Sequence, residues 1–153
     1  MVISDDNIAQ INIAQAKGDL ESPFMSGFTN RLDEINKIAD ESAGFVWRLQ
    51  DDDGNAASLR VFDDEFILVN MSVWETLENL KMFVYKTIHK ELLKDKRNWF
   101  NKGLGLHQAL WWIPKGHKPS VEEGKNKLAE LEKSGPSDAV FTFANAKRSP
   151  THL

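Results

Sequence analysis

Two hydrophobic periods alternate along this chain, and together they predict its elements. Alternation of apolar and polar residues predicts strands over residues 8–16, 45–50, 58–62, 66–71, 107–113 and 139–144. Recurrence about every 3.6 residues predicts helices over residues 23–41, 72–97 and 120–135. The order contains a β-α-β-β-α-β kernel, which is the ferredoxin-like split unit, with an extra strand and a C-terminal helix. We therefore expect one α+β domain over residues 1–145, followed by a polar tail over residues 146–153.

The helix starts and the buried helix faces carry further signals. Residues 72–75 and 120–123 both have the Ser-x-x-Glu pattern of a capping box, which predicts helix N-termini there. Apolar residues about one turn apart form a stripe on the longest helix: Leu77, Leu80, Val84 and Ile88. The stripe predicts that Leu80 and Val84 are core residues.

Bulky rings are frequent, with five tryptophans and nine phenylalanines. Trp111 and Trp112 are adjacent in a predicted strand, so their rings are expected on opposite faces of the sheet. A sheet with helices on only one face would expose rings on the other, and large exposed apolar areas are rare on monomers. We therefore expect a homodimer that packs sheet against sheet.

Charge and composition exclude several classes of protein. The net charge of −4 disfavours a general nucleic-acid binder. The chain has no cysteine, which excludes disulfides, thiolate metal sites and cysteine nucleophiles. No apolar run approaches the roughly 20 residues needed to cross a bilayer, and the N-terminus has no basic region typical of a signal peptide. We expect a cytoplasmic protein without nucleic-acid or membrane partners.

Several segments together resemble a known family. They are residues 44–49, 70–75, 83–100, 110–114 and the Gly-Pro pair at 135–136 before residues 141–143. Their arrangement resembles the bacterial family of domain of unknown function 3291, in the dimeric α+β barrel superfamily beside antibiotic-biosynthesis and haem-degrading monooxygenases. The resemblance implies the barrel fold and a homodimer. It implies a reaction less directly, because the family has no established activity.

Among the histidines, His89 is the strongest candidate for a catalytic or ligand-binding residue. It lies off the apolar stripe of its helix, near Met82 and Tyr85. It is either a half-exposed packing residue or a ligand or proton donor at the edge of a cavity. In the haem-degrading relatives a histidine of the corresponding helix binds iron, which makes haem a possible cofactor. Asn79 stands where those enzymes carry a tryptophan, which argues against haem degradation.

Polar residues on the predicted strands form a second candidate group. Gln10 and Asn12 share one face of the first strand, and Arg48 lies on the second strand. Buried polar side chains need partners, so these residues bond one another at a dimer seam or bond a ligand. The resemblance to cofactor-free monooxygenases implies that Asn12 or Asn70 orients a phenolic substrate, with His89 as proton relay.

These residues suggest a pocket between the long helix and the sheet. We expect it to bind a hydrophobic or aromatic small molecule through Arg48, Trp47, Trp74, Tyr85, Trp99 and Trp111. For the tryptophans, aromatic core packing is the alternative role. Two functions remain open: a monooxygenase-like enzyme that needs no nucleotide cofactor, and a non-catalytic dimeric small-molecule-binding module. An oxidisable substrate can supply its own electrons, so the enzyme need only desolvate and orient it.

Overall fold

The computed structural model describes residues 6–15, 26–49, 67–89 and 108–145. Its four strands are β1 (Asp6–Gln15), β2 (Phe45–Arg48), β3 (Ile67–Trp74) and β4 (Gln108–Pro114). They form an antiparallel sheet in the order β2-β3-β1-β4. Its helices are α1 (Ser26–Glu41), α2 (Leu77–His89) and α4 (Val121–Ser134), with a short 3-10 turn η2 (Phe143–Asn145). The predicted α+β class is confirmed.

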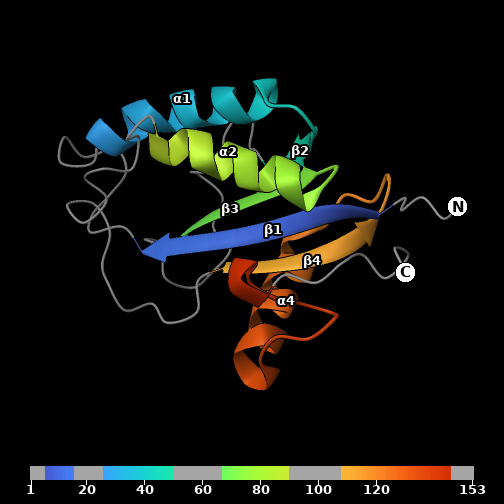
Figure 1. The fold of residues 1–153 in the computed structure, drawn as a ribbon. Helices are drawn as coiled ribbons and strands as arrows, with labels where there is room; N and C mark the ends of the chain where they lie inside the picture. The colour runs from blue at the N-terminus through green and yellow to red at the C-terminus, as the bar shows by residue number, and fades with distance from the viewer. Residues whose placement is uncertain (1–5, 16–25, 50–66, 90–107, 146–153) are drawn as a thin grey trace, which may run out of the picture.

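Helices lie on both faces of the sheet (Figure 1). Helices α1 and α2 cover one face, which we call the helix-pair face; in β1 it carries Ile8, Gln10 and Asn12. Helix α4 lies against the opposite face, which we call the α4 face; in β1 it carries Ile11 and its alternate neighbours. The expectation that one face of the sheet lacks a helix is therefore wrong, because α4 packs on that face.

Close packing joins α4 to the sheet at Gly124. A Cβ atom built on Gly124 would lie 3.0 Å from Ile11 Cδ1 and 3.0 Å from Met71 Sδ. Ile11 and Met71 are fully buried, as is almost all of Trp111. The rings and aliphatic side chains of this face are thus covered within one chain, which removes the reason for sheet-to-sheet pairing. The homodimer itself stays a prediction.

Trp74 is the centre of the core on the helix-pair face. Its side chain is fully buried. Phe83 of α2 stacks on its ring with centroids 5.0 Å apart, and Phe45 of β2 meets it edge-on at 5.5 Å. Leu80 is 2% exposed and belongs to the same core cluster, as predicted. Val84, one turn later on α2, is half-buried and packs against that cluster, so it lies at the margin of the core and not inside it.

The start of α2 differs from the prediction. Ser72 and Trp74 lie in β3, where they pair with Gln10 and Ile8 of β1. The helix begins later, and the Thr76 hydroxyl caps it by accepting a 3.0 Å hydrogen bond from the Asn79 backbone N–H. The Ser-x-x-Glu pattern at residues 72–75 is therefore not a capping box, because β3 continues through Trp74 in its pairing with β1. The predicted continuation of this helix to residue 97 lies outside the described residues.

A glycine sets the turn between α1 and β2. Gly44 has φ of +79°, and a Cβ atom there would overlap the Asn79 side chain at the start of α2. Its carbonyl accepts a 2.8 Å hydrogen bond from the Glu75 N–H. Only glycine allows this backbone conformation and this close approach together. The turn thus brings the end of α1 against the start of α2.

Of the two hydrogen bonds that define a capping box, the second predicted box forms one. Ser120 Oγ accepts a 3.1 Å hydrogen bond from the Glu123 N–H at the start of α4. The Glu123 carboxylate instead accepts a 2.8 Å bond from Trp111 Nε1 and lies 2.7 Å from His117 Nε2. One carboxylate therefore ties the helix to a buried ring of β4 and to the preceding turn.

The C-terminal segment forms less strand than predicted. Residues 139–144 contribute one bridge, in which Phe141 and Leu110 exchange backbone hydrogen bonds of 2.8 and 2.9 Å. Val140 and Phe141 are fully buried against opposite faces of the sheet. The segment covers the β4 edge in place of a full strand. The predicted strand at 58–62 and the tail at 146–153 lie outside the described residues.

Replacing Leu80 by alanine should lower the free energy of unfolding by about 2–5 kcal/mol, because it removes buried methyl groups and leaves a cavity. Urea denaturation followed by circular dichroism measures the change. Met82 is 55% exposed on the same helix, so Met82→Ala should cost less than about 0.5 kcal/mol. Equal losses for both variants would contradict the observed face of α2.

Gly124→Ala should destabilise the protein by about 1–2 kcal/mol, although alanine is the better helix former by about 1 kcal/mol. The added methyl group has to displace Ile11 or Met71, which lie 3.0 Å from its position. Asn126→Ala on the same helix is the control; Asn126 is exposed, so the variant should gain a few tenths of a kcal/mol. A gain in stability for Gly124→Ala would show that α4 does not pack here.

Candidate functional site

A buried polar network crosses the helix-pair face of the sheet. Gln10 of β1 is 4% exposed. Its Nε2 donates to Asn70 Oδ1 at 2.6 Å and to Ser72 Oγ at 2.9 Å, both on β3. Strand register places these residues side by side, because Gln10 lies opposite Ser72 and Asn12 lies opposite Asn70. The partners of Gln10 are therefore two residues of β3, and not Asn12 or Arg48 as the sequence suggested.

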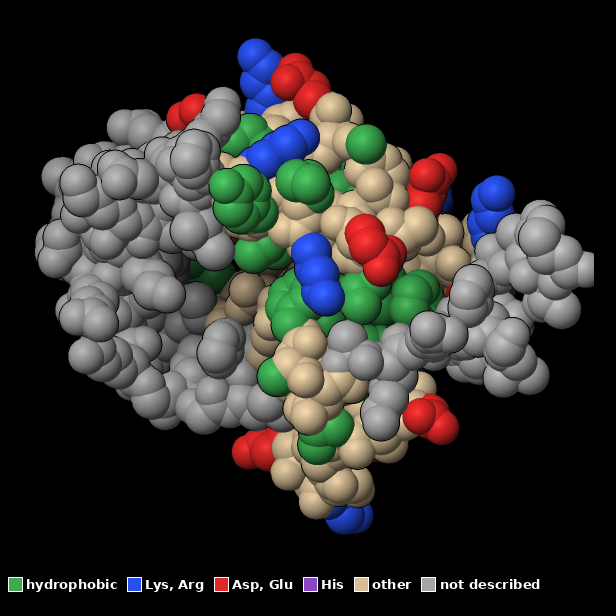
Figure 2. Space-filling model, in the orientation of Figure 1, with side chains coloured by type: hydrophobic (Ala, Val, Ile, Leu, Met, Phe, Trp, Pro, Cys, Tyr) green, Lys and Arg blue, Asp and Glu red, His purple; other side chains and the backbone are tan. Residues whose placement is uncertain are grey.

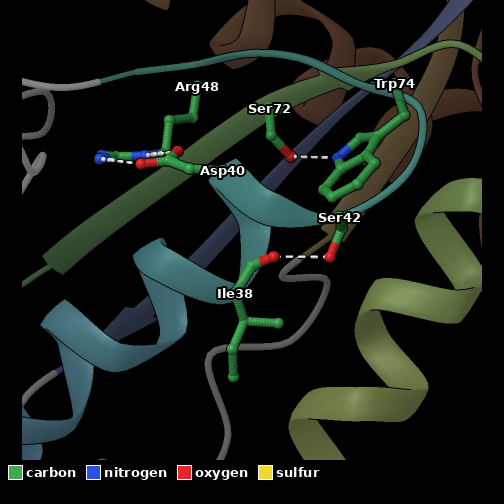
Figure 3. Close-up of polar contacts among 6 residues, drawn as sticks. All are labelled: Ile38, Asp40, Ser42, Arg48, Ser72 and Trp74. Atoms are coloured by element: carbon green, nitrogen blue, oxygen red, sulfur yellow. Dashed lines mark hydrogen bonds and ion pairs between the residues drawn. The ribbon is translucent and has the colours of Figure 1, made fainter.

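Trp74 joins the aromatic core to this network (Figure 3). Its Nε1–H donates to Ser72 Oγ at 2.9 Å. The Ser72 oxygen accepts both this bond and the bond from Gln10, so its own proton is used in neither. The network therefore keeps a hydroxyl proton and the Nδ2 group of Asn70 as donors beside an apolar core.

Arg48 is held by an acidic residue of α1. Arg48 Nε donates to Asp40 Oδ1 at 2.8 Å and its second nitrogen donates to Asp40 Oδ2 at 3.3 Å, so the contact is a fork (Figure 3). The Arg48 side chain is 11% exposed and that of Asp40 is 46% exposed. Asp40 lies near the C-terminus of α1, where the helix dipole disfavours a negative charge, and Arg48 offsets it. Arg48 thus joins β2 to α1 and its charge is balanced.

A row of three amides lies one step further along the same face. Asn70 of β3, Asn12 of β1 and Gln108 of β4 are neighbours across three adjacent strands, as the pairs Asn12–Asn70 and Asn12–Gln108 show. We call these three residues the amide row. Asn70 is exposed, and the other two are half-buried. The face therefore changes from aromatic at Trp74 to wholly polar within two steps along the strands.

The other expected site residues are not gathered on this face. Trp47 and Trp111 pack in the cluster on the α4 face. Tyr85 of α2 is 61% exposed. The face of the molecule drawn in Figure 2 shows hydrophobic side chains among charged ones. The side chain of His89 and the whole of Trp99 lie outside the described residues. Trp74 is on the helix-pair face but fully buried, so it supports the polar network from below.

Sequence reasoning missed three residues of the site. Ser72 was assigned to a helix cap, and neither Gln108 nor Asp40 was considered. Ser72 lies two residues before Trp74 and two after Asn70, so a strand spacing would have placed all three on one face. Gln108 and Asp40 have no comparable local signal, because strand register and helix packing alone bring them there.

The chemistry of this face is that of neutral hydrogen-bonding groups. Residues 6–15, 26–49, 67–89 and 108–145 contain no cluster of three or more His, Asp or Glu side chains able to hold a metal ion. In the same ranges, no helix is long and apolar enough to cross a membrane. The arrangement can orient a ligand through amides and a hydroxyl next to aromatic rings.

Ser72→Ala should lower the free energy of unfolding by about 1–3 kcal/mol, because it leaves the buried Trp74 N–H and one amide proton of Gln10 without an acceptor. A double-mutant cycle with Trp74→Phe, followed by urea denaturation, isolates the indole bond. In the Trp74→Phe background the serine substitution should cost less, since no indole N–H remains to be satisfied. Additive losses would contradict the bond between them.

Comparison with known proteins gives one family and two distant structures. No curated protein is similar enough to be matched. A protein from Nitrosomonas europaea named as an antibiotic biosynthesis monooxygenase is 10% identical, with a TM-score of 0.48 over 78% of this chain and 99% of its own. SnoaB, a cofactor-independent oxygenase from Streptomyces nogalater, is 14% identical, with a TM-score of 0.48 over 75% of this chain and 99% of its own. The model of the domain of unknown function 3291 matches residues 7–153, and the chain belongs to that family.

Proposed function

We propose that the protein binds an aromatic small molecule on the helix-pair face and oxygenates it without a nucleotide cofactor. The observation that carries the proposal is the polar network of Gln10, Asn70 and Ser72 beside Trp74, in which the Asn70 Nδ2 group and the Ser72 hydroxyl proton stay available as donors next to an aromatic core. Concave apolar surroundings with a few placed polar groups are the usual form of a small-molecule site. The solved structure of SnoaB, a cofactor-independent oxygenase, is a distant relative in fold alone.

The reaction has simple requirements. An activated methylene group that is conjugated with a carbonyl through aromatic rings loses a proton to give an electron-rich enolate, which reacts with O2; one oxygen atom enters the product as a ketone, and the other leaves as water with the two hydrogens of the methylene group. The substrate supplies all the electrons. The protein has to orient the carbonyl, stabilise the oxyanion through donors and exclude water. We assign the donor role to Asn70 and Asn12.

His89 is our candidate for the proton acceptor. It is the last residue of α2, which together with α1 covers the helix-pair face of the sheet (Figure 1). An imidazole has an ordinary pKa near neutrality and suits proton transfer at physiological pH. His89→Gln should therefore lower the rate of oxidation more than it lowers binding.

Anthrone, a planar tricyclic ketone with one activated methylene group, is the probe. Oxygen uptake and anthraquinone formation should rise above the rate in buffer, and Asn70→Ala should lower the enzymatic rate by about tenfold through loss of one hydrogen bond to the oxyanion. Asn70→Ala also removes the acceptor of one Gln10 amide proton, so circular dichroism checks that the variant is folded before its rate is compared. Asn126→Ala on α4 is the matched control and should keep full activity.

Quenching of tryptophan fluorescence by anthrone reports binding separately from turnover. Binding without accelerated oxygen uptake would support the alternative function, a non-catalytic small-molecule-binding module. An absence of both binding and turnover would overturn the proposal.

A further inference from the structure

The amide row has hydrogen-bonding capacity that the fold does not use. Asn12 and Gln108 are half-buried, yet neither side chain has a hydrogen-bond partner among the described residues. Asn70 uses only its side-chain oxygen, which accepts a hydrogen bond from Gln10 Nε2. Among the described residues no buried side-chain nitrogen or oxygen lacks a partner, so the unused amide atoms of the row reach solvent. Three adjacent amides with accessible donors and acceptors are therefore available to a ligand.

The geometry of the row limits the shape of that ligand. Neighbouring strands lie about 4.8 Å apart, so the three side chains span about 10 Å across the sheet, which is the length of a two- or three-ring fused system. The aromatic core around Trp74 lies two steps away on the same face, on the side of Gln10 and Ser72. A flat molecule of this length can therefore meet all three amides along one edge.

The charges of this face limit its chemistry. The amide row and the Gln10–Ser72 pair are uncharged, and the Arg48 charge on the same face is paired with Asp40. An anionic or cationic edge would lose hydration here without gaining an opposite charge. A carboxamide offers an acceptor and donors in one plane, which is complementary to a lactam or imide group in the same plane.

We propose that the amide row reads the polar edge of a planar, uncharged heterocycle in which hydrogen-bond donors and acceptors alternate, as in a lactam or imide. This inference rests on the proposed function, because it names the class of molecule held at that site. It adds a selectivity that aromatic binding alone would not produce.

Two probes of nearly the same shape test this inference. Alloxazine and phenazine are both linear three-ring compounds with a central pyrazine ring, but only alloxazine carries an imide edge. In titrations followed by quenching of tryptophan fluorescence, wild-type protein should bind alloxazine about tenfold more tightly than phenazine. Asn12→Leu and Gln108→Met, which remove an amide at similar volume, should each reduce this preference, measured as the ratio of the two dissociation constants in the same variant, to less than about threefold.

The control is Asn126→Leu, an amide substitution on the exposed side of α4 that should keep the full preference. Circular dichroism checks that each variant is folded, and Gln108→Met at the outer strand β4 serves if Asn12→Leu does not fold. Equal wild-type affinity for the two probes would overturn the inference and leave the proposed function standing. Binding of neither would overturn both. A preference that survives both substitutions would show that other residues read the edge.

Discussion

The buried indole N–H of Trp74 is the constraint on which the helix-pair face depends. A fully buried N–H without an acceptor is costly, and Ser72, two residues away on the same strand, supplies the acceptor. The same oxygen then accepts from Gln10 on β1, so one hydroxyl connects two strands. Phe83 and Phe45 complete the surroundings of the ring from α2 and β2. The hydrogen bond between Ser72 and Trp74 thus joins the aromatic core of this face to its polar network.

On the α4 face, the close approach of α4 to the sheet determines the packing. Gly124 lets α4 lie directly on Ile11 and Met71, and Glu123 in the preceding position accepts a bond from the buried Trp111. The large rings buried in the described residues are therefore divided between two cores, with Trp74 and Phe141 in one and Trp111 in the other. Helices of the same chain lie on both faces of the sheet.

This division has a consequence for function. Trp47 and Trp111 belong to the α4 core, whereas Trp74 and the amide row share the helix-pair face. Polar groups that could bind a ligand are found on the face whose helix pair includes the end of α2 at His89. In the chemistry we propose, amides and a hydroxyl contact the ligand. The tryptophans act chiefly as packed side chains of the two cores.

Local sequence patterns were enough to predict much of this protein. Alternation placed β1, β2 and β4 within a few residues and put Gln10 and Asn12 on one face, since side chains of a strand alternate strictly. The stripe through Leu80 identified the buried side of α2. Those properties depend on near neighbours in the chain, so the sequence carries them directly.

Tertiary structure alone decided the rest. The Ser-x-x-Glu pattern at residues 72–75 is compatible with a helix cap, and only pairing with β1 makes Ser72 and Trp74 part of a strand. Register between strands distant in sequence assembled the amide row from Asn12, Asn70 and Gln108. The packing of α4 on the sheet decided that no face is bare, because it depends on the fit of Gly124 against two side chains more than fifty residues away. Local periodicity does not encode such contacts, since each is set by the shapes of segments far apart in the chain.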